Sequence, residues 1–487
     1  TGGTLTSSTA TLDLSNNVIL SSDSALSFKA LTLNNKVLTL DGQAGSFALT
    51  DELKLNNANG RIVQDSTSLK LNGGLSVDSG GVLRLTKSLD TGTAKIKLNG
   101  GLLAIDSDIT INSSIEHLAA STIEIKETKT LNYEGMTLKL GASVLSIKGG
   151  GSFTNTNPIE LDNAASQLKL SGISANYVRT SADSLGLIVE TSSSVNEMVV
   201  GHLIPVSISA NQNLSGIIEV FSNGNLQLNN SGTLAANVTM KGDAFGNETA
   251  GGKLEAKESL TFSGTLLQSA DHNGIELIIA SGKTLSYSGS KFGIGNHEFK
   301  LSGGGTLANT NDLELDNAGS KLTLSKSTKI SRLSTSGSGA SRVLTITDSE
   351  VDFTGNIVEN LLLSGNLSVT SDTAIALGNL TADAVLTLSS NMDVSSAELT
   401  LSDSAELSLG TANITAYVTN PVIVDSTQKL KNGGGSFDFA GGITLKSGSE
   451  LVGQGQEISG NISLSGGKLS IAQDTIFADN LAISAGS

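Results

Sequence analysis

Residues 155–164 read Asn-Thr-Asn-Pro-Ile-Glu-Leu-Asp-Asn-Ala, and residues 309–318 read Asn-Thr-Asn-Asp-Leu-Glu-Leu-Asp-Asn-Ala. The match extends without a gap over residues 129–171 and 283–325, at an offset of 154 positions. Internal repetition of this kind is the signature of stacked repeats, in which each unit buries its apolar face against the next. The chain is therefore predicted to be a repeat protein.

A shorter unit recurs within and outside these copies: two alternating strands joined by a small polar turn. Residues 31–40 read Leu-Thr-Leu-Asn-Asn-Lys-Val-Leu-Thr-Leu, and residues 464–471 read Leu-Ser-Gly-Gly-Lys-Leu-Ser-Ile. Alternation with a period of two places Leu, Ile and Val on one face of a strand and polar residues on the other. Asn-Asn, Asn-Gly and Gly-Gly supply the positive φ that a sharp corner needs.

Glycine triplets at 149–151, 303–305 and 433–435 lie 154 and 130 positions apart, both near multiples of 22. We therefore predict an all-β fold, a single long parallel β-solenoid (β-helix) of roughly 22 residues per coil, continuous over residues 1–487. About 22 coils spaced by ~4.8 Å would form a rod on the order of 100 Å long. The alternative is a string of β-sandwich modules, because Asn-Gly between strands also marks hairpins.

Two stretches break the rhythm. Residues 173–220 hold Tyr177, His202 and Pro205 among longer apolar runs, and we expect an irregular excursion there, either a loop or an enlarged coil. An alternative is a protrusion that binds a partner. A smaller loop is expected near residues 241–253.

The composition favours a thin core of many similar layers. Aromatic residues make up 3% of the chain, Trp and Cys are absent, and 55 glycines stand against 3 prolines. A hydrophobic fraction of 38% is too high for a disordered chain. Without cysteine there is no disulfide framework and no thiolate site.

The net charge of the chain limits the kinds of partner that it is expected to bind. The formal net charge is −16, the pI is near 4.7, and the arginines do not cluster, so a nucleic-acid partner is not expected. No apolar run approaches the ~20 residues of a membrane span, so no membrane insertion is expected. The chain begins at Thr1 without Met, and we interpret it as a mature or excised segment of an exported protein.

Candidate catalytic carboxylates are Glu160 with Asp162 and Glu314 with Asp316, each pair on one face of a strand. Glycan-cleaving enzymes use two carboxylates at a defined separation. Because the two pairs recur at matched repeat positions, we interpret them as a solvated outer face.

The other candidate sites are equally weak. The four histidines (His117, His202, His272 and His297) lack metal-binding spacing, and no nonapeptide or EF-hand calcium motif occurs. The glycine triplets are interpreted as corners, since no Lys-Ser/Thr follows them. Tyr133 and Tyr287 occupy equivalent positions and are interpreted as structural. The sequence thus nominates no catalytic, metal-binding or cofactor-binding residue and no cofactor, and no enzyme is expected.

The Gly/Asn corners, the Leu/Ile/Val ladders, the absence of Cys and the acidic surface together resemble the β-helical regions of bacterial surface proteins, namely autotransporter passengers and filamentous-haemagglutinin-like adhesins. The resemblance spans nearly the whole chain. It implies an extracellular location at the bacterial cell surface and a structural or adhesive role. The chain lacks the secretion-domain signature and wall-anchor motif of those families.

The function expected from these observations is a non-enzymatic segment or subunit of a bacterial surface fibre, stalk or sheath. Neither residues 1–6 nor residues 477–483 read as a polar cap, so we expect end-to-end self-association or continuation in a longer chain. One alternative is an adhesin passenger that binds a host or surface ligand. A remote alternative is a β-helical polysaccharide-active enzyme.

Overall fold

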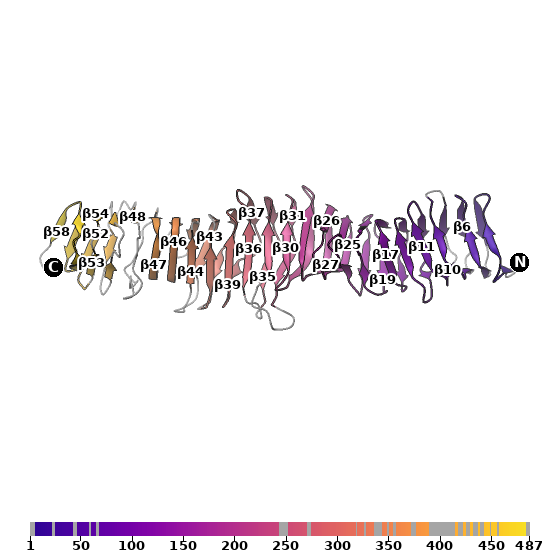
Figure 1. Cartoon of the computed structure of the whole chain (residues 1–487), viewed down its shortest axis with the longest axis horizontal. Helices are drawn as coiled ribbons and strands as arrows, with labels where there is room; N and C mark the ends of the chain where they lie inside the picture. Colours follow the sequence, from indigo (N-terminus) through magenta and orange to yellow (C-terminus); the bar gives the residue numbers. More distant parts are fainter. Residues whose placement is uncertain are drawn as a thin grey trace. The chain divides into compact units, whose positions relative to one another are not determined.

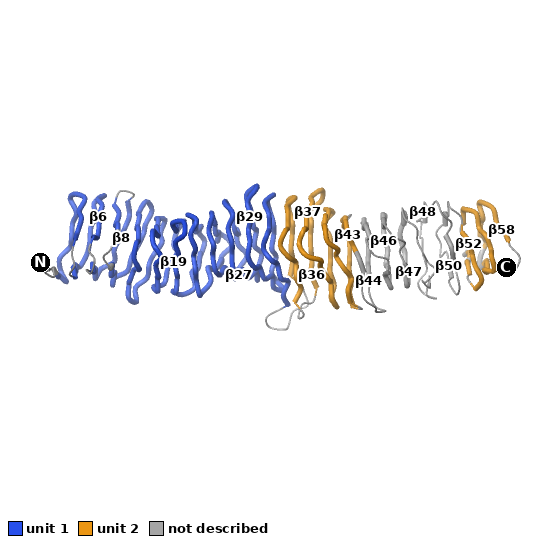
Figure 2. Tube along the Cα trace, turned by 180° about the vertical axis from the view of Figure 1, so that it is seen from behind, with its two compact units in different colours: residues 1–244 blue, residues 245–487 orange. Residues whose placement is uncertain are grey.

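The computed structural model describes residues 5–21, 25–41, 46–57, 60–64, 68–242, 252–269, 274–317, 319–325, 328–335, 343–347, 350–353, 357–371, 376–388, 414–416, 422–424, 429–431, 437–438, 443–448, 450–454 and 457–483. These residues form strands and turns, and no helix occurs among them. The chain divides into two compact units, residues 1–244 and 245–487 (Figure 2).

Unit 1 is a stack of coils in which every strand pairs in parallel with a strand about 21 residues away (Figure 1). Its first ladder of strands is unbroken. That ladder consists of β3 (Val18–Ser21), β6 (Val37–Asp41), β9 (Arg61–Gln64), β12 (Val82–Leu85), β15 (Leu102–Ile105), β18 (Ser121–Ile125), β21 (Val144–Lys148), β24 (Gln167–Ser171), β26 (Gly186–Thr191), β28 (Leu203–Ile208) and β30 (Asn225–Leu228).

The second and third ladders of unit 1 are interrupted. The second comprises β1 (Leu5–Thr6), β4 (Leu26–Phe28), β7 (Ser46–Leu49), β10 (Ser68–Leu71) and β13 (Leu89–Asp90), then β16 (Ile109–Ile111), β19 (Thr130–Tyr133) and β22 (Ser152–Asn155). The third comprises β2 (Thr11–Asp13) and β5 (Ala30–Thr32), then β8 (Leu53–Leu55), β11 (Leu75–Asp78), β14 (Ile96–Asn99) and β17 (Ile115–Ala119), then β20 (Leu138–Lys139) and β23 (Ile159–Leu161). Within these described strands, β5 does not pair with β8, β13 does not pair with β16, and β17 does not pair with β20.

The second and third ladders merge at β25 (Ser174–Thr180). This strand pairs with β22 through Ser174 and Ala175 and with β23 through Val178 to Thr180. The next two coils also have one long strand where earlier coils have two short ones, and after them the strand divides again. These strands are β27 (Ser193–Val200) and β29 (Asn213–Val220), and β29 pairs onward with both β31 (Thr233–Leu234) and β32 (Asn237–Met240).

The irregular excursion expected at residues 173–220 is therefore wrong. The segment forms β25 to β29, strands of six to eight residues that stay in the parallel ladders. Merging two faces removes a corner, and the register shortens to 19 positions, as between Leu187 and Val206. The short strand–turn–strand rhythm disappears because the strands have become longer.

The core consists of columns of aliphatic side chains that run across the coils. One column contains Leu103, Ile123, Ile147, Leu170 and Val189, which are successive register partners with no exposed surface. Such columns add apolar burial with every coil, at roughly 25 cal/mol per Å², so that stability accumulates along the stack.

Unit 2 begins with three ladders like those of unit 1. They are β33 (Lys253–Ala256), β36 (Ile275–Ile279), β39 (Glu298–Ser302), β42 (Lys321–Leu324) and β44 (Val343–Thr347); β34 (Leu260–Phe262), β37 (Thr284–Tyr287) and β40 (Thr306–Asn309); and β35 (Leu266–Gln268), β38 (Phe292–Gly293) and β41 (Leu313–Leu315). The second and third ladders again merge, at β43 (Lys329–Thr335), which pairs with both β40 and β41.

The remaining strands of unit 2 continue in parallel. They are β45 (Glu350–Phe353), β46 (Ile357–Ser371), β47 (Ala376–Leu388) and β48 (Ile414–Ala416); β49 (Val422–Val424), β52 (Ile443–Lys446), β55 (Ile462–Ser465) and β58 (Leu481–Ile483); β50 (Lys429–Lys431), β53 (Glu450–Gln454) and β56 (Lys468–Gln473); and β51 (Phe437–Asp438), β54 (Glu457–Ser459) and β57 (Ile476–Phe477).

Glycine triplets turn the corners, as the sequence predicts. Gly149 and Gly150 have φ of 115° and 84°, and Gly303 and Gly304 have 108° and 82°. A Cβ on Gly151 would lie 2.5 Å from the side chain of Ile125 in the preceding coil. The triplet at 433–435 lies outside the described residues.

The predicted fold class, an all-β parallel β-solenoid, is confirmed, with about 21 residues per coil against the roughly 22 expected. Continuity of one domain over residues 1–487 stays a prediction. The loop expected near 241–253 falls on residues 243–251, outside the described residues.

Candidate functional site

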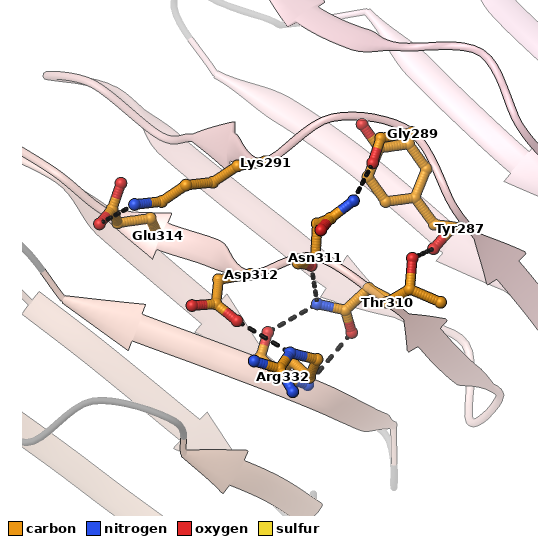
Figure 3. A network of polar contacts seen from close by, with 9 residues as sticks. Tyr287, Gly289, Lys291, Thr310, Asn311, Asp312, Glu314 and Arg332 are labelled. Atoms are coloured by element: carbon orange, nitrogen blue, oxygen red, sulfur yellow. Dashed lines mark hydrogen bonds and ion pairs between the residues drawn. The ribbon is translucent and has the colours of Figure 1, made fainter.

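A buried asparagine turns the chain at a polar corner of unit 2. Asn309 ends β40 and is 5% exposed. Its Nδ2 donates to the carbonyl of Asn311 (2.9 Å) and to that of Arg332 in the next coil (2.6 Å), while its Oδ1 accepts the N–H of Arg332 (3.2 Å). Asn311 in turn donates to the carbonyl of Gly289 in the preceding coil (2.7 Å). The corner therefore ties three successive coils together (Figure 3).

Unit 1 contains the same corner. Asn155 donates to the carbonyls of Asn157 and Tyr177, both at 2.7 Å, and accepts the N–H of Tyr177 at 3.1 Å. Asn157 donates to the carbonyl of Gly135 at 2.9 Å. The Asn-Thr-Asn that opens both repeated segments thus replaces strand hydrogen bonds at a corner, where the ladders cannot supply them.

The first candidate carboxylate, Glu160, is buried, so the solvated outer face expected for it is wrong. It is 3% exposed because β25 places Arg179 directly above it, with 2.6 Å between Arg179 Nη2 and Glu160 Oε1, and Lys139 lies 3.7 Å away. Burial raises the pKa of Glu160, but hydrogen bonds from Ser181 and Arg179 and the charges of Arg179 and Lys139 outweigh it. The pKa of this carboxyl therefore lies below its ordinary value.

The equivalent carboxylate in unit 2 is also buried and paired. Glu314 is 7% exposed and lies 2.5 Å from Lys291 Nζ. Its neighbour Asp312 pairs with Arg332 at 2.9 Å, beside the asparagine corner (Figure 3). Lys291, which pairs with Glu314, belongs to the preceding coil, whereas Arg332, which pairs with Asp312, belongs to the next coil.

The aspartates of the two candidate pairs hold turns. Asp162 Oδ1 accepts the N–H of Gly141 (2.8 Å), and Asp316 Oδ1 accepts the N–H of Gly295 (2.7 Å). All four candidate carboxylates therefore have structural partners. General acid–base catalysis needs a carboxyl that can reach a substrate and exchange a proton, and the contacts of these four support a structural role better.

Two buried tyrosines bridge gaps in the third ladders. The Tyr133 hydroxyl accepts the N–H of Ile115 (3.0 Å) and donates to the carbonyl of Met136 (2.7 Å). It thereby connects β17 to the corner before β20, where these strands do not pair. Burial raises the pKa of Tyr133 above its ordinary value.

Tyr287 has the same arrangement in unit 2. Its hydroxyl accepts the N–H of Leu266 (3.2 Å) and donates to the carbonyl of Ser290 (2.8 Å), next to the strands β35 and β38, which do not pair with each other. Burial raises its pKa as well. The structural role predicted for both tyrosines is confirmed.

The histidines lie apart. His117 is buried on β17, His202 is half-exposed with its Nδ1 3.9 Å from Asp183, and His297 precedes β39. His272 is outside the described residues. Across the described part of the chain, no group of three or more His, Cys, Asp or Glu side chains could hold a metal ion.

The last described coil of unit 2 exposes apolar side chains along strand edges. Ile476 on β57 and Ile483 on β58 are 64% and 68% exposed, and Leu481 is also exposed. A groove at this end is lined by Leu464, Leu469, Leu481 and Ile483 with glycines and Lys468. Within the described strands, β56, β57 and β58 each pair on one side alone, with β53, β54 and β55.

The first described coil of unit 1 is similar. Strands β1, β2 and β3 each pair on one side alone among the described residues, with β4, β5 and β6. Ile19 on β3 is 68% exposed. Which side chains are exposed on these described strands depends on the coil geometry, which the sequence pattern alone does not show.

No family model, no curated protein and no solved structure matches this chain. Among the described residues, no helix is long and apolar enough to cross a membrane.

Proposed function

We propose that this chain is a non-enzymatic structural protein of the bacterial cell exterior, a segment or subunit of a surface fibre, stalk or sheath that associates end to end. The observation that carries the proposal is the uniform parallel stacking of the described coils, from β1 with β4 in unit 1 to β55 with β58 in unit 2, together with the exposed apolar side chains Ile19, Ile476 and Ile483 on described strands. An open strand edge with apolar side chains is a template for further pairing.

The direction of the strands favours head-to-tail contact. All described ladder pairings are parallel, so a copy that adds its first coil to the last coil of another would continue the same hydrogen-bond pattern. Such a contact is heterologous and does not close on itself, so that it generates a filament. The net charge of −16 opposes lateral association of the sides of the fibre.

Electron microscopy and sedimentation velocity of the full chain over a wide concentration range test the proposal. The native chain should form filaments of constant width whose length grows with concentration. The double variant Leu481→Lys with Ile483→Lys should remain dispersed, because two cations at an open edge oppose pairing.

Met136→Lys is the matched control. Met136 is 72% exposed but lies at a corner of unit 1 away from the terminal strands, so its replacement should leave filaments intact. Discrete particles at every concentration would contradict self-association and make binding of a host or surface ligand the better hypothesis.

A further inference from the structure

The gap between β17 and β20 in unit 1 contains a buried histidine. His117 is 7% exposed, and its Nδ1 lies 2.9 Å from the carbonyl oxygen of Leu140. A carbonyl oxygen can only accept, so Nδ1 carries a hydrogen, and in the neutral ring Nε2 is then the bare nitrogen. Nε2 is buried and has no hydrogen-bond partner among the described residues.

The corresponding position in unit 2 carries glutamine. Ile115 and Leu266 both donate their N–H to the bridging tyrosine, so His117 and Gln268, each two positions later, occupy equivalent places beside equivalent gaps. Both polar atoms of the Gln268 amide are buried without a partner in the described part of the chain. The two gaps thus share a geometry but differ in whether their polar side chain can titrate.

We propose that the gap between β17 and β20 is an acid-sensitive clasp, in which protonation of His117 favours an opened state where the ring reaches water. The equivalent gap between β35 and β38 opens independently of pH because it carries Gln268. Unit 1 would then loosen locally in mildly acidic surroundings while the rest of its ladders remained paired.

The carbonyls of Leu140 and Val144 favour the charged ring, but burial outweighs them, and the charged side chains on the elements around the ring are engaged in ion pairs. These elements carry Lys97 on β14, Glu116 on β17, Lys139 on β20 and Lys148 on β21, and each of these pairs with another charged side chain, at 2.7, 3.4, 3.7 and 3.2 Å respectively. The phenol of Tyr133, which is hydrogen-bonded to Ile115 and Met136, is a further titratable group beside the gap.

The sign of the pH effect follows from burial. Burial lowers the pKa of His117, and the carbonyls of Leu140 and Val144, which favour the charged ring, do not compensate. An opened state restores the ordinary pKa near 6.5. As the pH falls below about 6.5 the opened state binds the proton first, so opening becomes more favourable, by up to about tenfold per pH unit, until the folded pKa is reached.

Hydrogen exchange of the full chain, followed by mass spectrometry at pH 7 and pH 5.5 and corrected for the intrinsic exchange rate, tests the clasp. In the native protein, the equilibrium constant for local opening at residues 115–119 and 138–144 should rise several-fold at the lower pH. The constant for residues 266–268 and 292–294 should not change. An unchanged opening constant at 115–119 would overturn the proposal.

Reciprocal exchange of the two side chains is the matched control. His117→Gln, which imitates unit 2 and retains a donor for the Leu140 carbonyl, should abolish the response of unit 1, whereas Gln268→His should create one in unit 2. A response that persists undiminished in His117→Gln would overturn the proposal. If that variant does not fold, NMR titration of the four native histidines decides, since a His117 ring that titrates at or above pH 6.5 excludes the mechanism.

Discussion

Replacing Tyr133 with Phe should loosen one gap of unit 1 without altering its core. The ring has no exposed surface and packs against Phe153, with 6.1 Å between ring centroids, and phenylalanine retains that contact. Only the hydroxyl is lost, and with it the bonds from the Ile115 N–H (3.0 Å) and to the Met136 carbonyl (2.7 Å).

The loss of local stability follows from the energies of these two hydrogen bonds. A buried hydrogen bond contributes about 0.5 to 1.5 kcal/mol net, and a buried donor left without a partner costs about 1 to 3 kcal/mol. Ile115 is 4% exposed, so water does not readily replace the hydroxyl there. We therefore expect Tyr133→Phe to reduce local stability by about 2 kcal/mol, which corresponds to roughly thirtyfold more frequent opening.

Hydrogen exchange measures this quantity locally, which matters because a long repeat array need not unfold in one two-state step. Amides of residues 115–119 and 136–140 should exchange faster in Tyr133→Phe, and Tyr287→Phe should reproduce the effect at residues 266–268. Tyr177→Phe is the control, since Tyr177 is partly exposed and its variant should behave like the native chain. Unchanged hydrogen exchange in both Tyr133→Phe and Tyr287→Phe would show that the two tyrosine hydroxyls do not stabilise the segments beside the gaps.

Three further substitutions test the corners and the packing. Gly151→Ala should destabilise its coil by about 1 to 3 kcal/mol, because the new Cβ would lie 2.5 Å from Ile125 Cγ2. Gly201→Ala is the control and should be nearly neutral, because its Cβ would come no closer than 3.5 Å to another atom. Resistance to proteolysis in urea measures the difference in stability between the two variants. Asn155→Ala should reduce stability by about 3 kcal/mol because it removes the three hydrogen bonds of a side chain that is 2% exposed, and exchange at the amide of Tyr177 reports the loss. Leu307→Phe introduces the residue that stands at the equivalent position 153 of the other repeat. The larger ring should fill part of a cavity of about 20 Å³ lined by Leu307, so that hydrogen exchange in β40 slows by an amount equivalent to about 0.5 kcal/mol. Faster exchange would show that the cavity cannot accept the ring.

The local chemistry of the fold could be predicted from the sequence because it depends on near neighbours along the chain. Alternation of Leu with Ser or Lys identifies the strands and their inward faces, and Gly-Gly identifies the corners, since only glycine readily adopts their positive φ. The repeat at an offset of 154 positions predicts a structural role for Tyr133 and Tyr287, because they occupy equivalent positions in it. Parallel stacking followed from that repetition.

The number of faces in a coil was decided only by the tertiary structure. Residues 173–220 contain ordinary strand sequence, but β25 pairs with two strands of the preceding coil at once, and that choice depends on hydrogen bonds to residues about 20 positions away. A pattern with a period of two cannot show whether a strand continues through a corner. The expected excursion was wrong for this reason.

The environment of each polar side chain likewise depended on contacts between coils. Glu160 has the sequence context of a solvated strand, but Arg179 of the next coil lies directly against it and makes its burial tolerable. His117 is buried beside the gap between β17 and β20, and no local pattern of residues marks that gap. The sequence by itself determined which residues form strands, which of them face inward and where the corners turn. The register between coils is set by hydrogen bonds between residues distant in the sequence, and it decided which polar side chains form hydrogen bonds with each other and which do not.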